Sequence, residues 1–506
     1  MVAFGNEILG RASIPHTTKI FQEVDIHIVT AAPATAGRHN LLLSLVHEGV
    51  THFQPQGVPP VEIALEVQDG PPQADADLFE IALRSNWAFY HPSGYVSCLS
   101  DGTVLPRVLE RGEGSHVWDS SGRRYIDYTM GWGCALLGHG HKEIEASVRR
   151  WMGCGPTLPL PHRIELELTD ALCQQAKIPC AEAAAFGKNG SDVCTLAVRL
   201  ARLATGRHTI LFCGYHGWQD WYAEGLGFGG TGVPERDRQI VHRFSYNDIP
   251  SFRHAISEHR ADLAAVMLEP SGASGGVDGI GEDTDLAFLN VVAEDTRAAG
   301  GLLIFDEIIT GFRYPGGSVQ KATNVIPDLA CFGKALGNGF PISALLGRRD
   351  LMRLMSRTFY GPTFKGEVYS LAAARSALTI YGSEPVAEHV CLFGQRLRAG
   401  LMQICGACGV DARVVGPPFR MRLVFAEPDP LRRKLLHTLY VQQLLGAGLI
   451  TYQGIMLPSY AHGEAELSHT MSVMEDALGR CAHYSERESI ELHRCIEIPL
   501  IDLPGS

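Results

Sequence analysis

Short, continuous apolar runs alternate with amphipathic helical patterns through the middle of the chain. Apolar residues recur at helical spacing in residues 162–175 and 191–205. The apolar runs are "HTILFCG" at 208–214, "LAAVMLEP" at 263–270, "GLLIFDE" at 301–307 and "DLACFG" at 328–333. Strands of a parallel sheet are buried on both faces, so they read as continuous apolar runs joined by helices. The pattern predicts an α/β fold whose mostly parallel sheet is flanked by helices.

The first 85 residues carry a different pattern, which predicts an N-terminal extension or small appended domain. The runs "VDIHIVT" at 24–30 and "VEIALEV" at 61–67 predict strands. Between them, "GRHNLLLSLVHEGV" at 37–50 predicts a helix. Pro and Gly cluster in the connecting stretches, as is typical of turns and linkers. We find no catalytic set of residues within 1–85.

The rest of the chain divides into a large domain and a smaller lobe. Residues 86–134 are expected to form the N-terminal part of the small lobe, and "GSHVWDSSGRRYIDYT" at 114–129 predicts a hairpin around a Ser-Gly turn. Residues 135–380 carry the alternating strands and helices and are expected to form the large domain. Residues 381–506 mix helices and strands and are expected to form an α+β C-terminal small domain.

Composition narrows the class of protein. The chain has 506 residues, of which 45% are hydrophobic and 19% charged, and its formal net charge is −12. This acidic balance argues against partners such as nucleic acid or an anionic membrane. The first residues lack the apolar core of a signal peptide, and no apolar run approaches the roughly 18 residues of a membrane span. We therefore expect a soluble, cytoplasmic protein.

Cysteine usage predicts thiols rather than a metal site. Thirteen cysteines are scattered along the chain, and Cys405 and Cys408 form one CxxC motif. A zinc site needs a second pair or histidines at finger spacing, and neither accompanies this motif. We expect reduced cysteines and no metal.

Acidic residues stand where two of the predicted strands end. Glu269 follows "LAAVML", and Asp306 and Glu307 follow "GLLIF". Ligands of such sheets bind at the carboxyl ends of the strands. An acid there can simply begin a helix or belong to a charged loop. A buried carboxylate, however, is costly unless a cation or several donors satisfy it, and a protonated cofactor nitrogen is one such cation.

Three further positions suggest a cofactor when they are taken together. Gly190 and Ser191 precede a long helix, where free N–H groups make an anion site, although an ordinary helix cap is the alternative. Tyr215 follows a strand and could stack on a flat ligand or pack in the core. Lys334 follows another strand and could act as a nucleophile towards an aldehyde or remain solvated. An anion seat, a flat face, a carboxylate and a lysine are the needs of pyridoxal 5'-phosphate.

The order of these motifs resembles the class III aminotransferases among the fold-type I pyridoxal phosphate enzymes, most closely the glutamate-1-semialdehyde aminomutase-like branch. The similarity runs from about Arg107 to about Leu478. It is carried by the motifs "GWGCALLGHGH", "NGSD", "RLARLATGR", "GYHGW", "DEIITGFR", "FGKALGNGFP" and "SHT". The resemblance implies a fold-type I architecture in which residues 135–380 are the cofactor-binding domain.

The resemblance also implies roles around the cofactor ring. Lys334 would bond the cofactor aldehyde and move the proton during catalysis. Asp306 would pair with the pyridine nitrogen, while Tyr215 and Ile308 would pack against the two faces of the ring. Gly190 and Ser191 would hold the phosphate, by backbone and hydroxyl groups.

Other implied roles concern the surroundings of the cofactor. Glu269 would lie close to it, and Glu307 would support the site. Trp132 would line the substrate side. Thr363 would reach the phosphate of a neighbouring subunit, so the resemblance implies a homodimer with active sites at the subunit interface.

Three positions depart from the aminomutase pattern. Ser100 stands where the aminomutase has an arginine that grips its substrate's carboxylate, and Ala461 stands near the position of an acid. The stretch "PTFKGEV" around Thr363 replaces the usual "GTxSGNP". The chemistry survives these changes, but we expect a different substrate.

The leading hypothesis is an aminotransferase with two half-reactions. An amino acid donor would load the cofactor, and an aldehyde or ketone acceptor would then take the amino group, in secondary-metabolite or sugar biosynthesis. The alternatives are a glutamate-1-semialdehyde-type aminomutase, a racemase or decarboxylase of the same fold, and a cofactor-binding regulator without turnover.

Two other features remain open at this level. Arg420 and Arg422 in "PPFRMRLVF" could clamp a donor carboxylate or could be solvated or salt-bridged. The stretch "GLGFGG" at 225–230 fits a dinucleotide fingerprint, but no clear strand precedes it and no helix follows it. We interpret it as a loop beside the active site.

Overall fold

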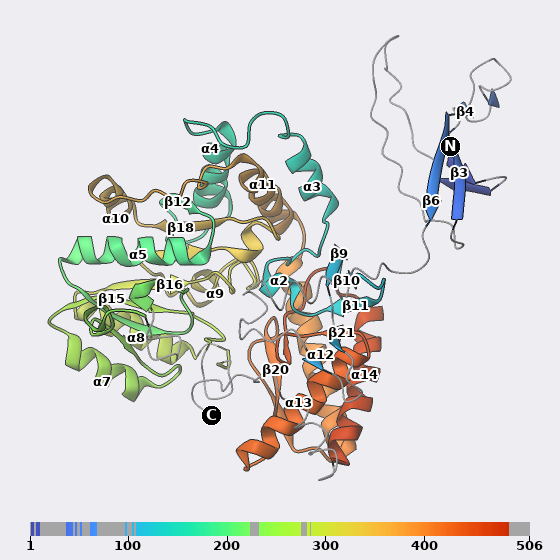
Figure 1. Cartoon of the computed structure of the whole chain (residues 1–506). Helices are drawn as coiled ribbons and strands as arrows, with labels where there is room; N and C mark the ends of the chain where they lie inside the picture. The colour runs from blue at the N-terminus through green and yellow to red at the C-terminus, as the bar shows by residue number, and fades with distance from the viewer. Residues whose placement is uncertain are drawn as a thin grey trace. The chain divides into compact units, whose positions relative to one another are not determined.

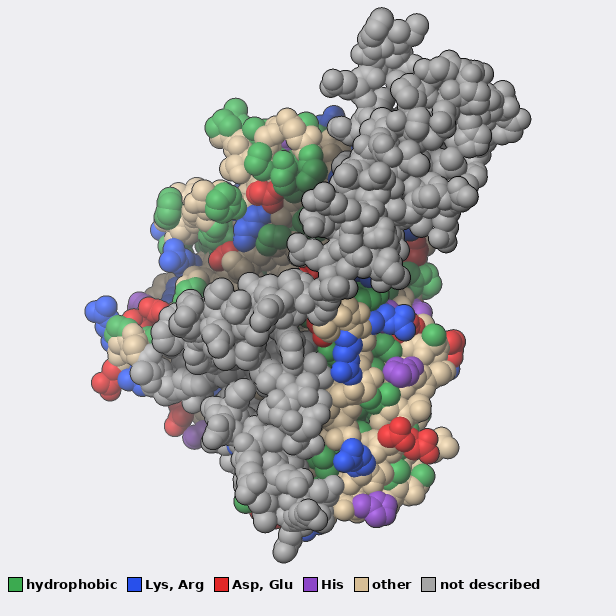
Figure 2. Space-filling model, turned by 45° about the vertical axis from the view of Figure 1, so that its right-hand side comes forward, with side chains coloured by type: hydrophobic (Ala, Val, Ile, Leu, Met, Phe, Trp, Pro, Cys, Tyr) green, Lys and Arg blue, Asp and Glu red, His purple; other side chains and the backbone are tan. Residues whose placement is uncertain are grey.

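The computed structural model describes residues 108–222, 232–274, 281–283 and 285–484, and gives only the strands of the first 107 residues. The chain divides into two compact units, Met1–Trp87 and Ala88–Ser506. No helix of the described residues is both long and apolar enough to cross a membrane. On the face drawn in Figure 2, Lys and Arg side chains stand among Asp, Glu and His instead of forming one basic patch.

The first unit contains a four-stranded sheet with the order β2-β1-β3-β6, and β1, β3 and β6 pair antiparallel with their neighbours. The prediction of a helix at 37–50 is wrong, because Gly37–Leu43 is strand β3 and pairs along its whole length with β6, Val61–Val67. This long pairing overrides the local helical spacing. Residues 24–30 lie outside the described residues. The other strands before residue 108 are β1 (Val2–Phe4), β2 (Glu7–Gly10), β4 (Val46–His47), β5 (Thr51–His52), β7 (Ser97–Cys98) and β8 (Val104–Leu105).

A seven-stranded sheet forms the centre of the second unit, with the order β12-β18-β17-β16-β15-β13-β14. Only β18 runs against the other strands, so the sheet is mostly parallel, as the sequence predicts. The strands are β12 (Ala183–Gly187), β13 (Thr209–Cys213), β14 (Val241–Arg243), β15 (Leu263–Leu268), β16 (Leu302–Asp306), β17 (Leu329–Phe332) and β18 (Ser343–Gly347).

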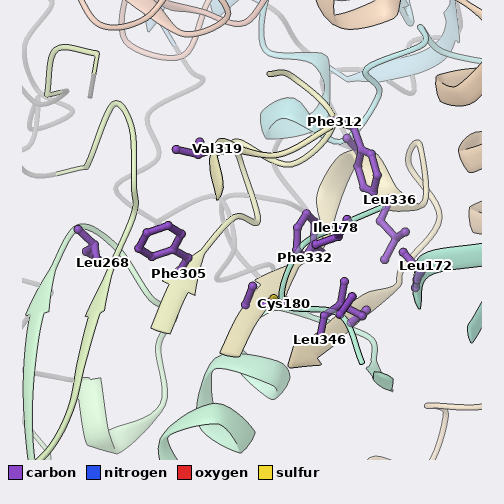
Figure 3. Packing of buried hydrophobic residues seen from close by; sticks show 14 of the residues in the cluster. Leu172, Ile178, Cys180, Leu268, Phe305, Phe312, Val319, Phe332, Leu336 and Leu346 are labelled. Carbon is purple, nitrogen blue, oxygen red and sulfur yellow. The ribbon is translucent and has the colours of Figure 1, made fainter. Parts of the chain in front are cut away.

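Helices cover both faces of this sheet (Figure 1). Helix α5 (Gly190–Thr205) packs on one face through a cluster that includes Val193, Leu196 and Leu200. A second cluster fills the other face, and Figure 3 shows part of it, including Phe305 and Phe332. The helices packed there are α3 (Lys142–Arg149), α4 (Arg163–Asp170), α7 (Ile249–His259), α8 (Leu286–Ala298) and α11 (Val368–Ser383).

The smaller lobe combines segments from both ends of the second unit. Strands β10 (His116–Asp119) and β11 (Arg124–Asp127) form the predicted hairpin, and β11 pairs in parallel with β21 (Leu449–Ile450). The remaining strands are β9 (Leu109–Glu113), β19 (Ala412–Val415), β20 (Met421–Phe425) and β22 (Ile455–Met456). Its long helices are α12 (Val386–Cys408), α13 (Pro430–Gly446) and α14 (Glu464–Ala482).

Short helical turns complete the second unit. Helix α4 continues into the π-helix η3 (Ala171–Gln175). The other short elements are α2 (Met130–Gly133), α6 (Glu235–Arg238), α9 (Val319–Thr323), η5 (Lys334–Leu336), α10 (Arg349–Met352) and η6 (Arg353–Arg357). Of these, α2 and η5 contact each other beside the carboxyl ends of the central strands. We therefore expect the functional site at the carboxyl ends of the central strands.

Candidate active site

Three neighbouring strands end in the polar residues that the sequence singles out. Glu269 follows β15, Asp306 is the last residue of β16, and Lys334 comes two residues after β17. These strands are adjacent and parallel, and Asp306 pairs in register with Cys331. Because parallel strands share one carboxyl edge, the two acids and the lysine meet there.

Asp306 is a buried carboxylate with an ordered set of donors. Its Oδ2 lies 2.8 Å from Nδ1 of His216, whose side chain is fully buried. Oδ1 accepts a hydrogen bond from the backbone N–H of Ile308 at 3.1 Å, and the Cys194 thiol lies 3.7 Å from Oδ2. His216 lies next to Tyr215, but nothing in the local sequence indicates its role. Only the fold shows that this histidine orients the carboxylate.

Lys334 lies in a strained and partly buried turn. It adopts a positive φ of 46°, which is unusual for a residue with a side chain. Burial lowers the pKa of its amine below the ordinary value, and the positive charge of Arg420 lowers it further. Cys134, Glu269 and Asp306 act in the opposite direction. A lysine with a lowered pKa has more of the neutral amine that attacks an aldehyde.

The anion seat is built at the first turn of α5. Asp192 accepts hydrogen bonds from the backbone N–H groups of Lys188 at 3.0 Å and Asn189 at 2.9 Å, which fixes the turn as a capping box. Gly190 and Ser191 then present their N–H groups at the positive end of a 16-residue helix. A Cβ at Gly190 would lie 2.5 Å from Cδ1 of Ile308, so any larger residue here would have to displace that side chain.

Glu269 joins the strand ends to a buried arginine. Its Oε2 accepts a hydrogen bond from the backbone N–H of Tyr215 at 3.0 Å, and its Oε1 lies 3.4 Å from Nη1 of Arg420. Arg420 also donates to Gly272 O at 3.0 Å and to Ser274 Oγ at 2.9 Å. Arg420 is thus a salt-bridged arginine within electrostatic reach of Lys334.

The two arginines of "PPFRMRLVF" contact different parts of the structure. Arg422 lies 3.0 Å from Nε2 of His437 on α13. Burial, helped by the charge of Arg422, lowers the pKa of His437 to about 3, and the same Nε2 also lies 3.0 Å from the backbone carbonyl of Gln453. Arg422 therefore belongs to the packing of the small lobe, and Arg420 alone belongs to the site.

Aromatic side chains line the open side of the site. Tyr215 is 47% exposed and Trp132 is 50% exposed, which leaves ring faces for a ligand. The Trp132 ring lies 6.3 Å from the ring of Tyr452, a residue that the sequence analysis did not assign. Tyr452 follows the two-residue strand β21, which carried too weak a pattern to point to a site.

Glu307 and Thr363 lie apart from this group. Glu307 is fully buried and accepts hydrogen bonds from Val319 N at 2.7 Å and Gln320 Nε2 at 3.0 Å, so it ties β16 to α9. Thr363 is exposed in the loop between η6 and α11. Ser100 and residues 225–230 lie outside the described residues.

The residues present fit pyridoxal phosphate. An amine with a lowered pKa, a carboxylate held by His216, a helix N-terminus without room for a Cβ and a half-exposed tyrosine meet the needs of its aldehyde, ring nitrogen, phosphate and ring face. The aldehyde would meet Lys334, and the phosphate would meet Gly190 and Ser191. Among the described residues, no group of three or more His, Cys, Asp or Glu could hold a metal ion.

Comparison with known proteins identifies the class. The model of the family "Aminotransferase class-III" matches residues 99–223 and 233–474, which is most of the chain. The chain therefore belongs to the class III aminotransferases. It is a pyridoxal phosphate-dependent transaminase, and the predicted cofactor and enzyme class are confirmed.

Two curated relatives show the range of this family. The chain is 30% identical over 378 residues to a 3-aminobutyryl-CoA aminotransferase of Cloacimonas acidaminovorans, covering 74% of this chain and 89% of the relative. It is 31% identical over 419 residues to a glutamate-1-semialdehyde 2,1-aminomutase of Halobacterium salinarum, covering 74% and 93%. The predicted resemblance to the class III aminotransferases, with glutamate-1-semialdehyde aminomutases among the relatives, is confirmed.

Solved structures confirm the predicted fold-type I architecture. The FumI protein of Sphingopyxis sp. MTA144, solved in its pyridoxal phosphate internal aldimine form, is 30% identical with a TM-score of 0.72, covering 80% of this chain and 95% of that chain. An omega-transaminase of Sphaerobacter thermophilus is 26% identical with a TM-score of 0.70, covering 82% and 99%.

Proposed function

We propose that this enzyme moves an amino group from an amino acid donor to an aldehyde or ketone acceptor in two half-reactions. The observation that carries the proposal is the meeting of Lys334, Asp306 and the Arg420–Glu269 pair at the carboxyl ends of adjacent strands. Lys334 supplies the amine for the cofactor aldehyde, and Asp306 supplies the carboxylate for the ring nitrogen. Arg420 supplies a cation for a donor carboxylate, with Glu269 as the counter-ion that the donor would displace.

Each residue of the site has a defined task in this proposal. Pyridoxal phosphate, when bound, supplies a ring that withdraws electrons from the substrate carbon. Lys334 Nζ takes the proton from that carbon and later returns it, as general base and acid. Asp306, oriented by His216, keeps a proton on the ring nitrogen. Gly190 and Ser191 bind the phosphate, and Ile308 and Tyr215 hold the ring between them.

The proposal extends to a homodimer. Thr363 is exposed within one chain, as expected for a residue that acts in the partner's site. Large apolar side chains are exposed around it, with Phe359 at 81% and Leu160 at 77%. Their loops are joined, since Val368 N donates to Pro156 O at 2.9 Å. Such a patch on a chain of this size is typical of an interface.

An aminomutase is the second candidate, because the aminomutase of Halobacterium salinarum is as similar as the aminotransferase relative. Ser100 argues against it from sequence, since the substrate-gripping arginine of the aminomutase has been replaced. The identity of the acceptor, for which we propose a sugar-like or secondary-metabolite carbonyl, and a cytoplasmic location rest on sequence alone.

A donor panel tests the proposal. Purified holoenzyme is mixed with L-glutamate, L-alanine, L-phenylalanine or 2-phenylethylamine without an acceptor, and the cofactor absorbance is followed. A transaminase converts the cofactor with one or more donors and stops until a carbonyl acceptor is added. An aminomutase turns over glutamate-1-semialdehyde alone. Lack of any change with every donor and with the semialdehyde would contradict both functions.

Arg420→Gln sharpens this test. Loss of the guanidinium should raise KM for the donors that carry a carboxylate and leave 2-phenylethylamine unaffected. Arg422→Gln is the matched control, because Arg422 lies two residues further along, in β20, and contacts His437 instead of Glu269. Equal effects of Arg420→Gln on all donors would remove the carboxylate role from Arg420.

A further inference from the structure

A left-handed turn stands at the edge of the active site. Met130, Gly131, Trp132 and Gly133 have φ values of 45°, 58°, 58° and 80°. Residues with a Cβ are unfavourable in this region, and the run of four consecutive left-handed residues contains two of them, Met130 and Trp132. Strain of this kind is retained where the surrounding structure holds it and a function requires it.

The side chain that holds the turn is a buried arginine. Arg313 is 1% exposed, and its Nη2 donates to the carbonyl of Gly133. Its Nη1 donates to Ile309 O at 2.7 Å, and its Nε has no partner among the described residues. Burial lowers the pKa of this guanidinium to about 10, and no carboxylate of the described residues pairs with it. A buried cation without a counter-ion is costly, and an apolar side chain would fill the same space more cheaply.

The turn contacts the segment that carries the reacting lysine, since α2 and η5 lie against each other. Cys134, the residue after the turn, lies within electrostatic reach of Lys334 and of Arg313. Asn338 lies four residues after the lysine in the sequence. Its side chain accepts a hydrogen bond from Leu137 N at 2.7 Å and donates to Gly138 O at 3.0 Å. These two hydrogen bonds therefore fix the segment that follows the turn to the segment that follows the lysine.

We propose that Arg313 is a positioning residue that holds the turn Met130–Gly133, so that Trp132 forms a fixed wall of the substrate site. The hydrogen bond to Gly133 O keeps the turn left-handed, and the turn places the half-exposed Trp132 ring beside Tyr452. Arg313 itself touches neither substrate nor cofactor. The effect on substrates rests on the proposed function, whereas the effect on the turn does not.

Hydrogen exchange of backbone amides tests, without any substrate, whether Arg313 stabilises the turn Met130–Gly133. Gly133 N donates to Thr129 O at 2.8 Å and Ala135 N to Met130 O at 2.9 Å, so their amides report on the turn. In Arg313→Gln holoenzyme these amides should exchange faster by about ten-fold, while the amides of β15 keep their rates. Arg207→Gln is the control, because Arg207 also donates to two backbone carbonyls, Leu263 O and Ala299 O, away from the site. Unchanged exchange at the turn, or an equal rise throughout the protein, would overturn the proposal.

A second variant covers the case in which Arg313→Gln does not fold. A Cβ at Gly133 would lie 3.1 Å from Arg313 Nη2 and 3.2 Å from Leu457 Cδ2, at a φ of +80°. Gly122 has a φ of +81° and nothing within 4 Å, so Gly122→Ala carries the same backbone strain without the contact. Gly133→Ala should loosen the turn more than Gly122→Ala loosens its own hairpin. Equal effects would overturn the proposal.

A double-mutant cycle tests the link to Trp132. With a donor that the enzyme turns over, Arg313→Gln should raise KM by about ten-fold and change kcat little. The same substitution in a Trp132→Ala background should have a much smaller effect, because the wall that Arg313 positions is already gone. Additive effects would show that Arg313 acts elsewhere. The cofactor absorbance should stay unchanged in all variants, which separates this result from a failure of the transaminase proposal.

Discussion

The carboxylate of Asp306 is fixed by two partners from distant parts of the chain and by one from its own loop. His216 follows β13, Cys194 lies in α5 and Ile308 follows β16, yet all three contact this one carboxylate. A carboxylate fixed in this way would stay directed at the ring nitrogen in the proposed site. Its negative charge would keep that nitrogen protonated.

Asp306→Asn should therefore leave the fold intact and slow the reaction. An amide removes the charge at constant size, so the rate should fall by about two to three orders of magnitude, the range for loss of a charge-stabilising group. Single-turnover rates and thermal unfolding measure the two effects. Asp328→Asn is the control, because Asp328 is also buried beside β17 but pairs with Arg348 at 2.7 Å. A loss of only a few-fold in Asp306→Asn would reduce Asp306 to a structural residue.

Single residues also show what sequence can and cannot predict about the site. Asp306, Glu269 and Lys334 could be predicted because each follows an apolar run that reads as a strand. His216 and Arg313 could not, because their roles depend on contacts made only when the strands and the turn at Met130–Gly133 are assembled. The charge and the strain of those contacts leave no local pattern in the sequence.

At the scale of elements, the apolar runs predicted the strands of the central sheet, because burial on both faces leaves little freedom in composition. The segment Gly37–Leu43 was mispredicted because its strand state depends on pairing with β6, which local spacing does not show. Glu307 illustrates a further link between elements, since its buried carboxylate joins β16 to α9 through Val319 and Gln320. Burial raises the pKa of Glu307 to about 7, although four hydrogen bonds, from the backbone of Val319 and Gln320 and from the side chains of Gln320 and Thr310, act to lower it.

Glu307 should make stability depend on pH. Because its folded-state pKa of about 7 exceeds the ordinary 4.5, the folded state holds the proton more tightly, and stability falls as pH rises from about 4.5 to about 7. Glu307→Gln should lose about 1–3 kcal/mol at pH 5 through its altered hydrogen bonds. The difference from wild type should shrink towards pH 8, as measured by denaturant unfolding. A difference that stays constant between pH 5 and pH 8 would mean that Glu307 is ionised throughout this range, and would contradict the raised pKa.

At the scale of the whole molecule, every proposed site residue lies in the unit Ala88–Ser506. The family match also begins at residue 99. The division of that unit at residues 134 and 380 stays a prediction.

Because the proposed site residues all lie after residue 87, a chain that begins at Ala88 should still bind pyridoxal phosphate with the same absorbance. We expect this shortened chain to have lower solubility or altered substrate selection. Cofactor titration of the truncated protein checks this. A well-folded truncated chain that does not bind the cofactor would show that the first unit helps to build the site.

The homodimer is the second prediction at this scale. Sedimentation should give twice the chain mass of 55.0 kDa. Thr363→Ala should weaken cofactor phosphate binding without dissociating the dimer, because one hydroxyl contributes little to the interface. A fully active monomer would contradict the proposal that Thr363 completes the partner's site.

The central claim is that Lys334 is the residue that bonds the cofactor, and borohydride trapping tests it most directly. Reduction of the holoenzyme makes the bond between cofactor and lysine permanent, and peptide mass spectrometry then locates it. The account predicts the added cofactor mass on the peptide that contains Lys334, and no trapped cofactor in Lys334→Ala, which should also lack turnover. Cofactor trapped on a different lysine, or a Lys334→Ala enzyme that retains substantial transamination, would contradict the account.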